Sequence, residues 1–354
     1  MTRDYITLFV RVALLLAPSI SVQAQAVKGE TPSSVVVSAP GKRVVFPALE
    51  EDETRYWDKG FLISIQHRAS KTQPAVVLYD SAGSARQKAN VWIDNAVEVM
   101  VTHAAATESG NLIVSGAAKD PTGKIAYFLA TIDSSGNPAK LLRTNPFVPQ
   151  QICGGENGTV WALGFDRDVD EGRTGSDYAL LRKYSLDTGF VTETFQRSKL
   201  ARAGRVYPMG STMRCNSSQI GIYTGLDHEW AKYDVKSKVL RIWKAPELAS
   251  VGRKITGLAF SGDGELFASI MDQAEGTSGL YKFVSRNTGD GEWSAVESTV
   301  KPFEHSAVAV LMGSTRDTMI YESSLQERDS NDKQTLSFAR FTKVGSGRAT
   351  APAH

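Results

Sequence analysis

The sequence predicts an all-β fold, a six-bladed β-propeller built from four-stranded antiparallel blades. One short unit occurs six times: a small or turn-forming residue, a variable position and an apolar run typical of a strand. The units begin 50, 48, 60, 46 and 53 residues apart, which is the length of a four-stranded sheet and too long for a helical-hairpin or leucine-rich repeat. They start at Gly60, Gly110, Gly158, Ser218, Gly264 and Asp317.

Polar turns between β-rich runs support this prediction. Asp, Asn, Ser and Gly tolerate left-handed backbone and close short hairpins. Apolar residues at helical spacing are absent from every window of 12 or more residues beyond the N-terminal segment. Each unit is therefore expected to form strand, turn, strand, loop, strand, turn, strand. The turns are Asp80–Gly83, Asp133–Gly136, Asp187–Gly189, Asp234–Ser237 and Asn287–Gly289.

The strand before each repeat unit is expected to be the innermost of its blade, and the last blade lacks an outer strand. Residues 35–37 and 43–46 near the N-terminus are strand-like and otherwise unassigned. We expect them to complete the last blade and close the ring, which removes an exposed sheet edge. The alternative is a degenerate seventh blade from residues 33–60, which has few residues for four strands.

The first 26 residues are predicted to be a cleaved signal peptide. Arg3 and Arg11 precede a brief apolar stretch, and Ala24-Gln25-Ala26 has small residues at the positions that a signal peptidase reads. The stretch is far shorter than the roughly 20 residues of a membrane span, so an uncleaved anchor is the weaker alternative. We expect a secreted or periplasmic protein with a flexible segment at 27–34, a propeller at 35–343 and a disordered tail at 344–354.

Charge argues against nucleic-acid binding. Loss of Arg3, Arg11 and Asp4 takes the 40 basic and 38 acidic residues to 38 and 37, a net charge of +1, and no basic run of five or more occurs. Nucleic-acid binding needs concentrated positive charge. No later stretch is long and apolar enough for a membrane helix, so no integral membrane segment is expected in the mature chain. We also expect a monomer.

The two cysteines, Cys153 and Cys215, each lie shortly before a repeat unit, in neighbouring blades. An even count in an oxidising compartment favours pairing. A bond between them would close a loop of 62 residues. Closing such a loop stabilises a fold by roughly 4 kcal/mol on the chain-entropy model. The alternative is a pair of buried thiols whose Cα atoms lie too far apart to bridge.

Residues 255–268, with the sequence ITGLAFSGDGELFA, resemble the repeat of NHL and TolB-like six-bladed propellers. In that repeat an inner strand of small residues meets a glycine turn and an apolar second strand. Residues 107–133 are also similar. The resemblance implies binding of a protein, peptide or glycan and, in one branch, metal-dependent lactone hydrolysis.

Basic residues in the loops between blades are candidates for ligand binding. Arg202, Arg205 and Arg253 could bind an anion or carboxylate, because a guanidinium is a planar two-pronged donor. Tyr207 could stack on a sugar or peptide, or pack an inner strand. The alternative for the arginines is that they only solvate the loops.

Alternating acidic residues give a candidate calcium loop. Asp166, Asp168 and Asp170, with Asp177 at the twelfth position, alternate as oxygen ligands do in calcium loops. Glu171 stands where an EF-hand needs glycine, and strands flank the segment, so only a propeller-loop Ca²⁺ site fits. The alternative is an exposed acidic loop. No other cofactor is predicted, and none is required.

Two histidines lie on or near predicted inner strands. His103 and His305 could act as a base or a ligand, although a lone histidine more often has a structural role. The five histidines show no spacing typical of a transition-metal site, and no nucleophile elbow or phosphate-binding loop occurs.

Two classes of function remain. The first is a non-catalytic binding or scaffold propeller that recognises a protein, peptide or glycan on the face around the central channel. The second is a metal-dependent hydrolase or lactonase with a carboxylate-bound ion at the channel mouth, for which the suggestive residues are Asp94, Asn95, Glu98 and Glu304.

Overall fold

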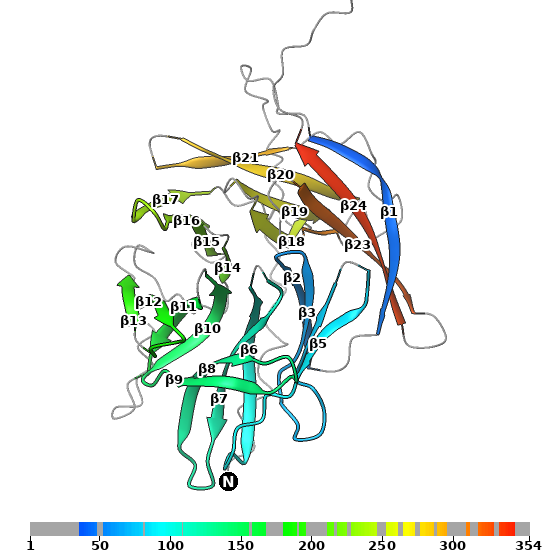
Figure 1. The fold of residues 1–354 in the computed structure, drawn as a ribbon. Helices are drawn as coiled ribbons and strands as arrows, with labels where there is room; N and C mark the ends of the chain where they lie inside the picture. Colours follow the sequence, from blue (N-terminus) through cyan, green and yellow to red (C-terminus); the bar gives the residue numbers. More distant parts are fainter. Residues whose placement is uncertain are drawn as a thin grey trace, which may run out of the picture. The chain divides into compact units, whose positions relative to one another are not determined.

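The chain folds into antiparallel β-strands that follow one another as four-stranded meanders (Figure 1). A computed structural model describes residues 35–47, 52–80, 82–107, 109–155, 158–167, 180–189, 191–195, 211–215, 218–224, 228–245, 253–260, 265–272, 277–286, 289–295, 309–311, 318–328 and 333–343. The secondary-structure elements within these ranges are all β-strands. None of the ranges contains a helix long and apolar enough to cross a membrane.

The first three sheets each consist of four consecutive strands. The first sheet contains β2 (Glu53–Asp58), β3 (Phe61–Gln66), β4 (Val76–Tyr79) and β5 (Ala85–Ala89). The second contains β6 (Glu98–Ala106), β7 (Leu112–Lys119), β8 (Ile125–Ile132) and β9 (Pro138–Arg143). The third contains β10 (Phe147–Gly154), β11 (Thr159–Asp166), β12 (Leu180–Ser185) and β13 (Val191–Phe195).

The fourth and fifth sheets repeat this arrangement, and a sixth sheet combines strands from both ends of the chain. The fourth contains β14 (Ser211–Cys215), β15 (Gln219–Thr224), β16 (Glu229–Asp234) and β17 (Val239–Lys244). The fifth contains β18 (Arg253–Phe260), β19 (Leu266–Asp272), β20 (Thr277–Ser285) and β21 (Gly291–Ala295). The sixth contains β22 (Ala309–Leu311), β23 (Thr318–Arg328), β24 (Lys333–Lys343) and β1 (Val35–Pro47).

The architecture is that of an all-β propeller with four-stranded antiparallel blades. The second strand of every sheet begins at or within two residues after the first residue of a predicted repeat unit. The first strands contact one another in succession: β6 lies against β10, β10 against β14, β14 against β18 and β18 against β22. The repeat spacing therefore predicted which strands form each sheet.

β1 pairs with β24 at the edge of the sixth sheet, and the two strands run side by side in Figure 1. Val35 lies opposite Lys343 and Pro47 opposite Lys333, with two register shifts between them. Because residues 35–47 join β24 and residues 53–58 join β3, the segment 33–60 is divided between two sheets. It does not form the seventh sheet considered as an alternative.

A recurring aspartate loop closes several hairpins. In three of them an aspartate Oδ1 accepts the backbone N–H groups of the residues two and four positions later, at 2.8 to 3.0 Å. The residue three positions later is a glycine with φ between 81° and 88°, a region that non-glycine residues rarely adopt. This geometry confirms the predicted turns at Asp80 and Asp133. The aspartates are Asp80, Asp120 and Asp133.

Apolar side chains fill the spaces between neighbouring sheets. Ile63 of β3 and Val114 of β7 belong to one fully buried cluster between the first and second sheets. Trp161 of β11 meets Tyr233 of β16 edge to face, with 5.4 Å between ring centroids, between the third and fourth. Each such side chain contributes roughly 1.5–3 kcal/mol over an exposed one. Apolar side chains thus hold neighbouring sheets face to face. Polar side chains add hydrogen bonds between first strands.

Candidate functional site

The first strands β6, β10 and β14 each have one edge that no strand of their own sheet covers, and side chains from the preceding sheet bind that edge. Tyr56 of β2 accepts the N–H of Ala104 in β6 through its hydroxyl at 2.8 Å and donates the same hydroxyl to the Ala104 carbonyl. Two residues further along β2, on the same side of the strand, Asp58 Oδ2 accepts the N–H of Ala106 at 2.9 Å. Asp58 is buried, so this hydrogen bond compensates the desolvation of its carboxylate.

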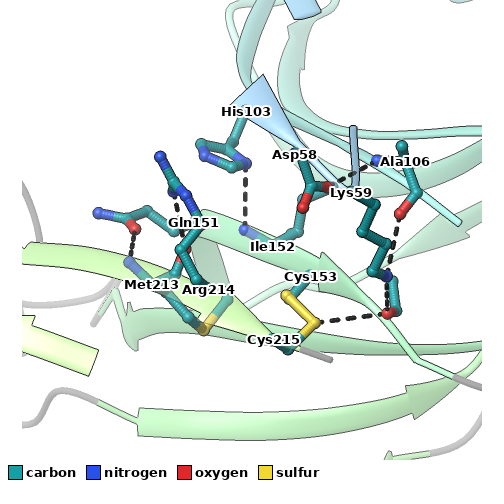
Figure 2. Close-up of a disulfide and its surroundings, with 11 residues drawn as sticks. Asp58, Lys59, His103, Ala106, Gln151, Ile152, Cys153, Met213, Arg214 and Cys215 are labelled. Atoms are coloured by element: carbon teal, nitrogen blue, oxygen red, sulfur yellow. Dashed lines mark hydrogen bonds between the residues drawn. A yellow bond between two sulfur atoms is a disulfide. The ribbon is translucent and has the colours of Figure 1, made fainter. Parts of the chain in front are cut away.

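Lys59 extends this contact to a third sheet (Figure 2). Lys59 and Gly60 form the two-residue turn between β2 and β3, with φ of 49° and 83°, as a type I′ hairpin requires. The Lys59 Nζ donates to the carbonyls of Ala106 at 3.1 Å and of Gly154 at 2.5 Å. A Cβ at Gly154 would lie 2.9 Å from the Ala106 carbonyl oxygen, so glycine permits the close approach of β6 and β10.

At the other end of β6 the edge is bound by the main chain. The N–H of Val101 donates to the His67 carbonyl at 2.8 Å, and the N–H of Ala69 donates to the Val99 carbonyl at 2.9 Å. The His67 Nδ1 lies 2.8 Å from the Val101 carbonyl. Hydrogen bonds to the first sheet therefore occur at both ends of this β6 edge, which blocks its pairing with another strand.

The same arrangement continues from β6 to β10 and from β10 to β14. Thr102 Oγ1 donates to the Pro149 carbonyl at 3.0 Å, and His103 Nδ1 accepts the N–H of Ile152 at 3.3 Å. Gln151 Oε1 then accepts the N–H of Met213 at 2.6 Å. Histidine and glutamine thus perform the same task in successive sheets: each holds a main-chain N–H of the next first strand.

Three of these side chains and Arg214 of β14 form a group that we call the inner-strand cluster. The rings of Tyr56 and His103 stack with 4.7 Å between centroids. The Arg214 Cζ lies 5.5 Å from the Tyr56 ring centroid, although β14 is separated from β2 by the first strands of two other sheets. Figure 2 shows His103, Gln151 and Arg214 together on one side of the disulfide. The cluster consists of Tyr56, His103, Gln151 and Arg214.

The cluster keeps its histidine neutral. Burial lowers the pKa of His103 to about 3, and the positive charge of Arg214 and the proximity of His67 act in the same direction. Burial also raises the pKa of Tyr56 above its ordinary value. Because Nδ1 accepts a hydrogen bond, the proton of the neutral ring is on Nε2. At neutral pH this histidine is a structural acceptor and a weak base.

The two cysteines form a disulfide between β10 and β14 (Figure 2). The Cα atoms of Cys153 and Cys215 lie 6.0 Å apart, within the ordinary range for a bridge. Cys215 Sγ lies 3.4 Å from the Gly154 carbonyl oxygen, which also accepts from Lys59. The disulfide therefore lies beside the contact that joins the first three sheets.

Most predicted ligand-binding residues lie outside the described residues: Arg202, Arg205, Tyr207 and His305. Arg253 was expected in a loop between blades, and this position is wrong. It is the first residue of β18 and lies opposite Asp272 of β19. The pairing of β18 with β19 begins two residues before the apolar run that starts at Ile255, so the strand includes the end of the polar segment.

Asp166 was expected in an acidic loop, and instead it ends β11. Its two carboxylate oxygens each accept a hydrogen bond from Arg182 of β12 at 2.9 Å. The same guanidinium lies 4.7 Å from the Phe147 ring centroid. The register of β11 with β10 extends to Asp166 and so places the carboxylate against the sheet. Asp168, Asp170 and Asp177 lie outside the described residues, and the calcium site stays a prediction.

The residues considered for a hydrolase do not gather in the part of the chain that is described. Asp94 and Asn95 are exposed in the turn before β6. Glu98 Oε1 lies 4.0 Å from Arg68 Nη2, and the Arg68 side chain is largely exposed whereas that of Glu98 is less than half exposed. Within the described ranges no three histidine, cysteine, aspartate or glutamate side chains are placed to hold a metal ion. Glu304 lies beyond those ranges.

No protein-family model and no curated protein sequence matches the chain. Similar solved structures include a luciferin-regenerating enzyme, at 12% identity and a TM-score of 0.43, covering 86% of this chain and 96% of that one. A DUF4221 family member from Bacteroides vulgatus has 10% identity and a TM-score of 0.44, covering 89% and 100%. The RRP9 WD40 repeats have 10% identity and a TM-score of 0.46, covering 81% and 78%. These similarities assign no function, and the NHL or TolB-like resemblance stays a prediction.

Proposed function

We propose that the protein is an exported, non-catalytic binding or scaffold propeller that holds a protein, peptide or glycan on the face around the centre of its ring. We propose further that the ring has six blades and that β1 closes it by completing the last one. The pairing of β1 with β24 supports this closure. The succession of contacts from β6 to β22 supports the ring.

One observation carries the binding proposal. The described polar side chains at the edges of the first strands hold main-chain groups of the neighbouring sheet. A general base or a nucleophile needs a group free to reach substrate and a pKa suited to the reaction. His103 meets neither condition, because its Nδ1 is engaged and its pKa lies near 3. These residues make a rigid frame, and recognition then falls to its loops and to those polar groups of the frame that the neighbouring sheets do not use.

Export is part of the proposal and is supported by the cysteines. A disulfide persists in oxidising compartments, which agrees with a secreted or periplasmic location. Sequencing the N-terminus of the protein recovered outside the cytoplasm tests this directly. We expect the mature chain to begin at Val27. Recovery of the intact chain in the cytoplasm with both thiols reduced would refute export.

The function is tested with the purified mature protein on a glycan array and against a peptide library. We expect saturable binding of one ligand class and no turnover of lactones in the presence of calcium, manganese or zinc. Lactone hydrolysis that a chelator abolishes, together with an absence of binding on both arrays, would favour the hydrolase. Titrating the mature protein with calcium tests the predicted calcium site at Asp166. A bound ion there must compete with Arg182 for the carboxylate.

A further inference from the structure

Arg214 differs from Arg55 and Arg182 in what surrounds its charge. Arg55 lies 3.0 Å from the Glu53 carboxylate, and Arg182 binds Asp166 with both of its terminal nitrogens. Arg214 has no carboxylate partner among the residues that the structure describes. Its contacts there are the Met213 carbonyl, which accepts from Nη1 at 2.8 Å, and the face of Tyr56.

The guanidinium is also held in a defined orientation. Gln151 accepts the N–H of Met213, and the Met213 carbonyl accepts a hydrogen bond from Arg214. The guanidinium lies over the Tyr56 ring, which is fixed by its own hydrogen bonds to Ala104. A guanidinium carries five N–H donors, and the Met213 carbonyl uses one Nη1 donor. An oriented fork with donors that no described residue uses is the arrangement that binds a carboxylate in a bidentate manner.

We propose that the inner-strand cluster is a binding site for a carboxylate group, with Arg214 as the ligand-binding residue and Gln151 as its positioning residue. The proposal rests on the proposed binding function and names the chemical group that this function would recognise. The carboxylate can belong to the C-terminus of a peptide or to an acidic sugar. The fit to Arg214 is the same in both cases, because only the carboxylate meets the guanidinium.

Charge supports the choice of an anion. His103 is neutral, and the charge of Arg214 contributes to keeping it so. A second cation at the cluster would meet the positive charge of Arg214, whereas an anion would neutralise it in partly buried surroundings, where screening by water is weak. The bound anion would also weaken the repulsion that disfavours a proton on His103. Binding at this site is therefore expected to be visible at the histidine.

The test uses the mature protein and three carboxylate probes: acetate, N-acetylglycine as a mimic of a peptide C-terminus, and glucuronate as an acidic sugar. Binding is followed by the NMR shifts of the His103 ring, assigned with a His103→Gln variant. We expect saturable shifts, with tighter binding of N-acetylglycine or of glucuronate identifying the source of the carboxylate. The apparent pKa of His103 should rise when the preferred probe is bound.

Variants separate the site from general charge effects. Arg214→Gln should weaken the preferred probe about tenfold or more, and Arg214→Lys, which keeps the charge and loses the fork, should weaken it less. Arg68→Gln is the matched control, because it removes one charge from a side chain that is 69% exposed, and it should leave binding unchanged. Equal binding in wild type and Arg214→Gln, or no saturable binding of any probe, overturns the proposal. Should Arg214→Gln fail to fold, Arg214→Lys supplies the comparison.

The same variants separate this proposal from the proposed function. If the ligand found on the arrays binds Arg214→Gln as tightly as wild type, the carboxylate site is refuted and the binding function stands. If the small carboxylates bind wild type in an Arg214-dependent manner while both arrays stay blank, the site stands and recognition of a large ligand is refuted.

Discussion

The seam between β2 and β6 and the seam between β10 and β14 meet the same requirement with different chemistry. In the first seam, Tyr56, Asp58 and Lys59 hold the edge of β6 by hydrogen bonds, and the Tyr56 ring stacks on His103. In the second, Gln151 contributes one hydrogen bond, and a disulfide joins the strands. Both bonding patterns fall near the end of the first strands where the repeat turns lie.

The comparison teaches that the distance between first strands is set by specific groups and not by strand pairing. The first strands β6, β10 and β14 each have an edge that could pair wrongly, and side chains of the preceding sheet bind it. The first seam should therefore respond to the loss of single polar atoms, whereas the second should respond mainly to reduction. The predictions below test that difference, beginning with the largest effect.

Loss of the disulfide should cost most. The bond closes a loop of 62 residues, so its removal in a Cys153→Ala, Cys215→Ala double variant is expected to lower the free energy of unfolding by about 4 kcal/mol on the chain-entropy model. Urea titration with and without dithiothreitol measures the effect. The double variant is its own control, since the reductant should leave it unchanged. Equal stability of oxidised and reduced wild type would contradict the assignment.

Tyr56→Phe should weaken the first seam by about 2 kcal/mol, because a partly buried N–H and carbonyl of Ala104 lose their shared partner. The phenyl ring still stacks on His103, so the change isolates the hydroxyl. Tyr127→Phe is the matched control: its hydroxyl accepts from Arg167 outside the seam, and its loss should cost under about 1 kcal/mol. A smaller effect for Tyr56 than for Tyr127 would show that the seam is insensitive to this contact.

His103 should make stability depend on pH in the acidic range. Its pKa is about 3 in the fold and about 6.5 when unfolded, so between these values the unfolded chain binds more protons. The contribution of neutral His103 to the free energy of unfolding is therefore complete above about pH 6.5, and it is lost as the pH falls towards 3. We expect wild type to lose on the order of 1 kcal/mol between pH 7 and pH 5 relative to His103→Gln. Parallel pH profiles of the two proteins in thermal unfolding would contradict this.

The smallest effect is expected at the outer surface. Lys140 of β9 forms an ion pair with Asp187 in the turn after β12, and both side chains are more than half exposed. Asp187→Asn should change stability by about 0.5 kcal/mol or less, since water and salt screen exposed pairs. Unfolding at low and high salt measures it. A loss as large as that of Tyr56→Phe would mean that the rim, and not the first-strand seam, determines how these sheets associate.

The sheets could be predicted from the sequence because their boundaries are local. Gly60, Gly110 and Gly158 have positive φ at the turns between first and second strands, and such residues recur at the length of one sheet. The strand-like residues near the N-terminus could be assigned to β24 because the last unit was one strand short. These inferences needed only the order of residues along the chain.

The inner-strand cluster could not be predicted in this way. Tyr56 and Arg214 belong to strands in different sheets, and their contact depends on how the sheets pack, which spacing does not report. His103 was noticed for its chemistry, but its engagement with Ile152 follows from the approach of β6 and β10. One clue was present in the sequence: His103 and Gln151 each stand seven residues before the first residue of a repeat unit, Gly110 and Gly158. Aligning the units would have given them equivalent positions in successive sheets. Asp166 was misplaced because Arg182, its partner, lies on the next strand.

The pairing of β1 with β24 also constrains how the molecule is made. β1 (Val35–Pro47) is synthesised before its partner β24 (Lys333–Lys343), and the strands β2 to β23 are made between them. Until then the N-terminal strand has no native partner, and the last blade stays incomplete. The sixth sheet can therefore be completed only after β24 has been made, and until then the unpaired edge of β1 is open to wrong partners.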